Sequence, residues 1–74
     1  MEKQIKLAAQ NALQAKRYLN QALEEMAGSE AIETLSDNWN RAMYVLLGLH
    51  FDQSKSVMAR YSWAYEQILN CIGV

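Results

Sequence analysis

The residues with the most obvious chemistry are His50 and Cys71, the only histidine and the only cysteine of the 74-residue sequence. His50 precedes Asp52 by two positions, and a carboxylate can orient an imidazole that acts as a general base. Such a base needs a nucleophile to activate, and the sequence contains no serine or cysteine elbow. His50 also ends an apolar helical segment, where an imidazole interacts favourably with the helix dipole. We therefore expect a capping or surface role for His50, no catalytic residue, and a protein that is not an enzyme.

Cys71 lies on or beside an apolar helical stripe. Reactive cysteines are activated by a helix N-terminus or a neighbouring cation, whereas Cys71 stands near the C-terminal end of its predicted helix. A buried cysteine there serves as a small hydrophobic residue; an intermolecular disulfide or a redox role is the alternative. A lone cysteine cannot form an internal disulfide and is typical of a reducing compartment, so we expect a cytoplasmic protein.

Acidic residues gather around the first predicted helix connection: Glu24, Glu25, Glu30, Glu33 and Asp37. A di-iron site in a helical bundle would carry the Glu-x-x-His spacing, which the sequence lacks. One histidine and one cysteine cannot complete a closed zinc site within a chain. We therefore expect no metal, no cofactor and no small-molecule substrate. The cluster is interpreted as a solvated acidic junction, or alternatively as an acidic patch that contacts a basic partner.

The seven basic residues are scattered along the chain, and the formal net charge is −1. The densest basic segment is residues 16–18, and Arg60 lies close to two aromatic residues. A helix-turn-helix protein needs a recognition helix with several polar, base-reading side chains. The third predicted helix offers only Gln53, Lys55 and Arg60 for that purpose. Nucleic acid is therefore an unlikely partner, kept as the alternative of a small regulator that binds through scattered basic residues on a helical dimer.

Length and composition limit how such a chain can be stabilised. A chain of this size buries only about 60% of its unfolded surface. Without disulfides or a metal, it depends on regular helix packing or on a second subunit. Hydrophobic residues make up 51% and charged residues 20%, which favours an interface. The longest near-apolar run, residues 42–49, is too short to span a bilayer, and no signal peptide is recognised, so no membrane association is expected.

The apolar spacing is helical throughout, with residues repeating at intervals of three and four. It predicts helices over about 2–27, 30–49 and 53–72, joined by short connections. No segment alternates with the period of two that a strand requires.

Three residues are predicted to mark the ends of these helices. Gly28 is expected in the left-handed conformation that ends the first helix. Ser29 is the predicted N-cap of the second helix and Asp52 that of the third. A later start of the second helix, at Ser36 or Asp37, is disfavoured because the apolar pattern continues through residues 29–35.

The first helix has an apolar stripe built mostly from alanine, including Ala8, Ala15 and Ala22 at intervals of seven. Good packing alternates small and large residues across facing positions. The large residues expected to face this alanine seam come from the other two helices: Trp39, Met43, Met58, Tyr61 and Tyr65. Whether the seam packs within the chain, or against a symmetry mate or another protein, stays open at this stage.

Trp63 falls off the predicted apolar stripe of the third helix, since one residue turns a helix by 100°. Tyr44 and Leu47 likewise form a second apolar face on the second helix. Aromatic residues outside the core are common anchors of protein interfaces. Trp63, Tyr44 and Leu47 are therefore predicted to bind a partner, together with the alanine seam, or alternatively to pack inside a chain whose helices are buried on two sides.

The sequence predicts one all-α domain over residues 1–74, a small three-helix bundle or a long antiparallel hairpin with a third helix. We expect it to oligomerise, as a homodimer or with another protein. The expected function is that of a small non-enzymatic interaction module acting by helix-face docking: a regulator, adaptor, inhibitor or chaperone-type protein.

Overall fold

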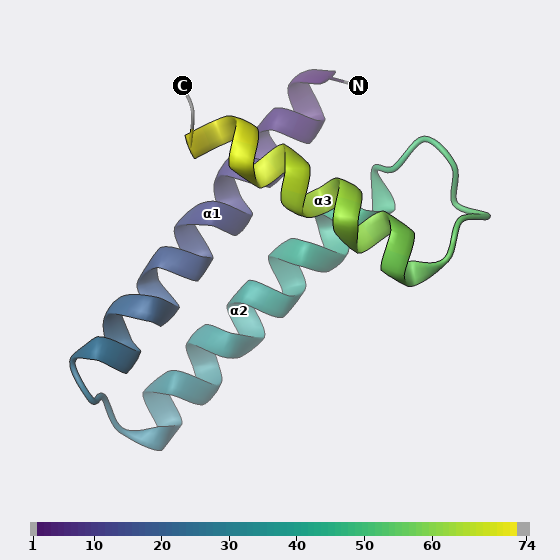
Figure 1. Ribbon diagram of the computed structural model, residues 1–74. Coiled ribbons are helices and arrows are strands. Elements are labelled where there is room, and N and C mark those ends of the chain that lie inside the picture. Colours follow the sequence, from purple (N-terminus) through teal and green to yellow (C-terminus); the bar gives the residue numbers. More distant parts are fainter. Residues whose placement is uncertain (1, 73–74) are drawn as a thin grey trace.

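The computed structural model describes residues 2–72, which fold into three α-helices and contain no β-strand. α1 spans Glu2–Glu24, α2 spans Ser29–Gly48 and α3 spans Val57–Ile72 (Figure 1). The predicted all-α class is confirmed, with the three helices in the expected order. α1 starts as predicted and ends three residues earlier, and α2 begins and ends one residue earlier, whereas α3 begins four residues later than predicted.

α1 and α2 form an antiparallel hairpin, and α3 lies across one end of it (Figure 1). We call that end, where α1 starts and α2 finishes, the α3 end. The opposite end, around the turn of residues 24–30, is called the hairpin tip. The three principal extents of the molecule are 38, 27 and 16 Å. Because packed helix axes lie about 8–10 Å apart, the shortest extent corresponds to two layers of helices.

The turn at the hairpin tip is a Schellman motif in which Met26 has the left-handed conformation, with φ 57°. The Ala27 N–H donates to the Ala22 carbonyl at 2.9 Å, and the Met26 N–H donates to the Leu23 carbonyl at 3.2 Å. The prediction for Gly28 is wrong, since its φ of −60° and ψ of 156° are extended. α1 ends three residues before the expected position, and Met26, two residues before Gly28, takes the conformation that Gly28 was expected to adopt.

The start of α2 also differs from the prediction. Gly28 is the N-cap residue and makes no side-chain cap, while Ser29 already belongs to the helix. The first backbone bond of the helix runs from the Ile32 N–H to the Gly28 carbonyl, at 3.1 Å. The first turn of α2 therefore lacks the side-chain acceptor that the sequence predicted for it.

The connection between α2 and α3 explains the late start of α3. Asp52 accepts a bond from the Ser54 N–H at 3.0 Å and another from the Ser54 hydroxyl, so its carboxylate stabilises a local turn. The N-cap of α3 is Ser56, whose Oγ accepts from the Ala59 N–H at 3.2 Å. The prediction that Asp52 caps α3 is wrong because its side chain already bonds to the backbone two residues ahead.

The core lies where the three helices meet, and half of its fully buried members are alanine: Ala8, Ala9, Ala12, Met43, Leu46, Leu47, Ala64 and Ile68. Met43 and Leu46 are the largest fully buried side chains. The alanine seam of α1 packs within the chain, because Ala8 and Ala22 are buried and Ala15 is half-buried. Alanine at these positions allows the neighbouring helices to approach α1 closely.

Candidate protein-interaction surface

The orientation of α3 about its own axis decides which of its side chains reach solvent. The stripe predicted for the third helix consists of Met58, Tyr61, Tyr65, Ile68 and Ile72. Ile68 is buried as predicted, but Met58, Tyr65 and Ile72 are 78%, 47% and 52% exposed. Ala64, which lies outside this stripe, faces the core and is buried. α3 thus presents a small residue where it approaches the alanines of α1, and its large residues point elsewhere. The predicted core role of Met58 and Tyr65 is wrong for this reason.

The outcome is a row of exposed apolar side chains along α3, which we call the α3 edge: Met58, Tyr65, Leu69 and Ile72. The spacing of these residues places them on one side of the helix. Leu69 is 62% exposed. Scattered exposed leucines are normal in proteins, but a continuous row of large apolar side chains is typical of a binding surface.

Aromatic contacts join the α3 edge to the hairpin. The ring of Tyr65 lies 6.2 Å from that of Trp39 on α2, and 6.4 Å from that of Tyr61, measured between centroids. The Nζ atom of Lys16 on α1 lies 5.2 Å from the centre of the Trp39 ring, within the range of a cation–π interaction. Trp39 and Tyr61 are half-buried and pack against the core. These contacts place Lys16 and Trp39 on the side of the hairpin that carries α3.

Of the two alternatives open for Trp63, an interface anchor or a residue packed inside the chain, the structure agrees more closely with the second. It is half-buried, packs against the core cluster, and meets His50 edge-on with ring centroids 4.9 Å apart. His50 also stacks on Phe51 at 4.5 Å. Because α3 is rotated about its own axis relative to the predicted orientation, Trp63 lies toward the end of α2 and Tyr65 lies toward solvent. Trp63 therefore offers only part of its ring to a partner.

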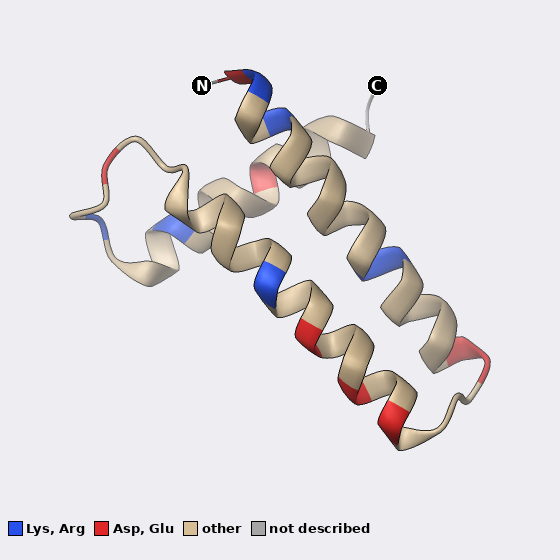
Figure 2. Cartoon of the chain, turned by 180° about the vertical axis from the view of Figure 1, so that it is seen from behind, with Lys and Arg blue, Asp and Glu red and all other residues tan. Residues whose placement is uncertain are grey.

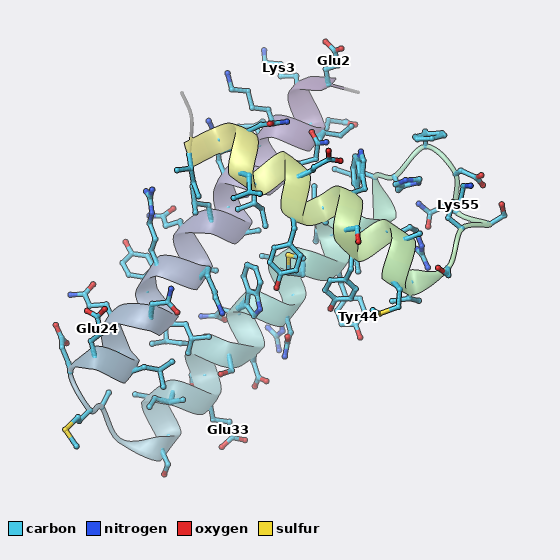
Figure 3. All side chains as sticks on the ribbon, in the orientation of Figure 1. Glu2, Lys3, Glu24, Glu33, Tyr44 and Lys55 are labelled. Carbon is cyan, nitrogen blue, oxygen red and sulfur yellow. The ribbon has the colours of Figure 1, made fainter. Side chains whose placement is uncertain are left out.

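Tyr44 and Leu47, the other two predicted anchors, have opposite environments. The Tyr44 side chain is 69% exposed and projects from α2 (Figure 3), as expected of a residue outside the core. Leu47 is only 3% exposed and belongs to the core cluster. Leu47 follows the alternative interpretation, in which α2 is buried on two sides, because it packs in one cluster with Ala64 and Ile68 of α3.

His50 is buried, 8% exposed, and lies just beyond the end of α2, so the expected surface position is wrong. Its Nδ1 atom accepts a hydrogen bond from the Asp52 N–H at 3.0 Å. The amide of Gln53 performs the capping that was expected of His50, because its Nε2 donates to the carbonyls of Leu47, Gly48 and His50 at 3.2, 3.3 and 2.9 Å. His50 therefore serves to order the loop.

Two further contacts stabilise this loop. The Gln53 Oε1 accepts a bond of 2.9 Å from Arg60 Nη1, which joins the end of α2 to α3. The Ser54 hydroxyl and the Ser54 N–H hold the pKa of Asp52 below its usual value, and the nearby His50 contributes less. Asp52, Gln53 and Arg60 are thus engaged in hydrogen bonds that hold this loop in place.

Cys71 is half-buried near the end of α3. Together with Ile5, Ala9 and Gln67 it lines an open cavity of about 300 Å³ between α1 and α3. Within residues 2–72, no three histidine, cysteine or acidic side chains come together in a way that could hold a metal ion. In the same part of the chain, no helix is both long and apolar enough to cross a membrane.

No protein-family model matches the chain, and neither the curated proteins nor the solved structures yielded a match. Sequence reasoning placed Met58, Tyr65 and Ile72 in the core and did not single out Leu69. One signal could have identified the α3 edge: an alanine suits a close contact with an alanine seam, and a core stripe that includes Ala64 leaves the α3 edge on the outside.

Proposed function

We propose that this protein is a small, non-enzymatic interaction module that binds another protein chain through the α3 edge. The observation that carries the proposal is the pattern of burial on α3, in which a small side chain is buried and several large apolar ones are exposed. Ala64 fills the core, while four larger apolar side chains of the same helix are about half exposed or more. Complete burial of one large apolar side chain contributes about 1.5–3 kcal/mol, so covering the exposed parts of these four contributes on the order of 5 kcal/mol.

The surroundings of the α3 edge suit a binding surface. Tyr61 adds to the apolar surface on α3, and Trp39 extends it onto α2. Aromatic side chains are frequent hot spots in protein interfaces. Lys16 beside Trp39 supplies a polar boundary. Tyr44, exposed on α2, is a second aromatic group available to a partner. The partner is thus expected to present a complementary apolar helix face.

The experiment compares Leu69→Arg with Leu7→Arg. Leu69 belongs to the α3 edge, while Leu7 is similarly exposed, at 55%, on α1. Leu7 precedes the buried Ala9 by two residues, a rotation of about 200°, so it points away from α3. Both variants should retain the helical circular-dichroism signal. Association is measured as molar mass by sedimentation, and as proteins retained on the immobilised chain.

Leu69→Arg is expected to abolish the association that the wild type makes with itself or with a retained protein, and Leu7→Arg to preserve it. Equal association by both variants would contradict the proposal. A wild type that stays monomeric at 100-micromolar concentration and retains no protein in a Leu69-dependent manner would overturn it.

A further inference from the structure

The surface area of the chain exceeds that of a compact monomer. Its accessible area is 5363 Å², whereas a folded monomer of 8.5 kDa is expected to expose about 4,700 Å². Its radius of gyration, 13.0 Å, compares with about 11.3 Å for a globular chain of this length. The excess area of about 700 Å² is close to the roughly 800 Å² that each partner buries in a standard interface. This excess is thus of the size that one standard interface covers.

The shape of the molecule shows where this area is located. α3, with 16 residues, is about 24 Å long, while α1, with 23 residues, extends for about 34 Å. α3 crosses the hairpin at one end, so the same face of the hairpin is uncovered toward the tip (Figure 1). Leu23 follows Lys16 by seven residues on this face and is 52% exposed, and Ile32 precedes Trp39 by seven and is half-buried. The molecule is therefore thinner toward the tip than at the α3 end, and we call this change in thickness the step. The uncovered apolar face of the hairpin beside the α3 edge, which includes Leu23 and Ile32, is called the floor.

Charge differs between the two ends of the molecule. Residues 18–40, which include the hairpin tip, contain five carboxylates and no lysine or arginine. The α3 end has four basic side chains and three acidic ones: Lys3, Lys6, Lys55, Arg60, Glu2, Asp52 and Glu66. Figure 2 shows the acidic residues gathered toward the tip, and in Figure 3 Glu24 and Glu33 lie at the end opposite Lys3. The tip therefore complements the α3 end of another copy and repels another tip.

From the area, the step and the charges we infer that the partner is a second copy of this chain, bound antiparallel. In this two-fold arrangement, the α3 edge of each copy covers the floor of the other, and each acidic tip lies beside the other copy's α3 end. The contact between an α3 edge and a floor is therefore made twice, once in each direction, as expected of a symmetric dimer. The inference rests on the proposed function, because it names the chain that the α3 edge binds.

The first measurement is zero-length carbodiimide cross-linking of the purified chain, followed by peptide mass spectrometry. Within one copy, α1 separates Lys3 and Lys6 from the tip by about 30 Å. A direct bond between Lys3 or Lys6 and Glu30 or Glu33 must therefore join two copies. We expect such peptides from the dimer band. A dimer whose cross-links join Lys3 and Lys6 only to the partner's α3 end would overturn the antiparallel arrangement.

The second measurement uses two variants that both change the net charge from −1 to +1. Glu30→Gln with Glu33→Gln removes negative charge from the tip, and we expect dimerisation about tenfold weaker in 50 mM salt. The matched control, Glu2→Gln with Glu66→Gln, makes the α3 end more basic and should strengthen dimerisation. At 500 mM salt both should approach the wild type, since screening removes the difference. Tighter binding by the tip variant would indicate a tip-to-tip dimer and overturn the inference.

Failure of this inference is distinguishable from failure of the proposed function. A purified chain that remains monomeric at 100-micromolar concentration, but retains a different protein in a Leu69-dependent manner, would overturn the dimer and leave the proposed function standing. A dimer that is insensitive to Leu69→Arg would overturn both.

Discussion

At the scale of single residues, the backbone of the tip does not follow the preference of its side chains. Met26 adopts a left-handed conformation that costs a residue with a Cβ about 1–2 kcal/mol, while Gly28 nearby uses none of its conformational freedom. The two hydrogen bonds of the Schellman motif hold Met26 there. The position of the turn was therefore decided by where α1 and α2 stop packing against each other.

Gly28→Ser is expected to raise the free energy of unfolding by about 0.5–1 kcal/mol. A Cβ at this position meets no atom within 4 Å, and the hydroxyl would provide the N-cap acceptor that α2 lacks. Urea denaturation measures the change. Gly28→Ala, which adds the Cβ without the acceptor, is the control and should be less stable than Gly28→Ser. A destabilised Gly28→Ser would show that Gly28 requires a positive φ.

Asp52 is expected to make stability depend on pH in the acid range. Its pKa is lowered in the folded state by bonds from Ser54, so Asp52 contributes stability above its unfolded pKa, near 3.8, and loses it as the pH falls through the folded value. The wild type should exceed Asp52→Asn in stability by a constant amount from pH 8 to pH 5. The difference should shrink below about pH 4. Denaturation across this range tests it, and a constant difference down to pH 2 would contradict it.

At the scale of helices, the alanine seam determines how closely α3 can approach α1. Ala9, Ala12 and Ala64 have no exposed area, so the helices approach each other closely at these residues. This close packing favours a small residue at the inner face of α3. It also explains why the larger residues of α3 form an exposed row.

Ala64→Leu is therefore expected to lower the free energy of unfolding by about 1–3 kcal/mol through overpacking. Ala59→Leu, at an exposed position of the same helix, is the matched control and should change stability by less than about 0.5 kcal/mol. Thermal and urea denaturation provide the comparison. Equal tolerance of both substitutions would mean that α3 is not held tightly against α1.

At the scale of the whole molecule, the thin stepped shape leaves more apolar surface outside than an alanine-rich core can offset. Among residues 2–72, twelve large hydrophobic side chains are exposed, while the buried hydrophobic set contains five that are larger than alanine: Leu19, Met43, Leu46, Leu47 and Ile68. A fold of this kind gains stability when a second chain covers the step. Folding and association are then expected to be linked.

The melting temperature should consequently depend on protein concentration. Between 5 and 500 micromolar, we expect a rise of about 5–10 °C for the wild type, because mass action favours the dimer. Leu69→Arg should melt at a temperature independent of concentration. Calorimetry at several concentrations measures both. A wild type with a constant melting temperature would contradict the link between folding and association.

The sequence by itself determined the three helices, their order and the alanine seam, because helical periodicity is a local property of neighbouring residues. It could not determine which side of α3 faces the core. The stripes Ala64–Cys71 and Met58–Tyr65–Ile72 have the same seven-residue spacing and are displaced by 100°. Apolar character favours the second stripe, but the tertiary structure buries Ala64, half-buries Cys71 and leaves the second stripe exposed. The physical reason is distance: the alanines of α1 draw α3 so close that only the small side chain of Ala64 fits between the helices, and the larger side chains are turned outward to form the α3 edge.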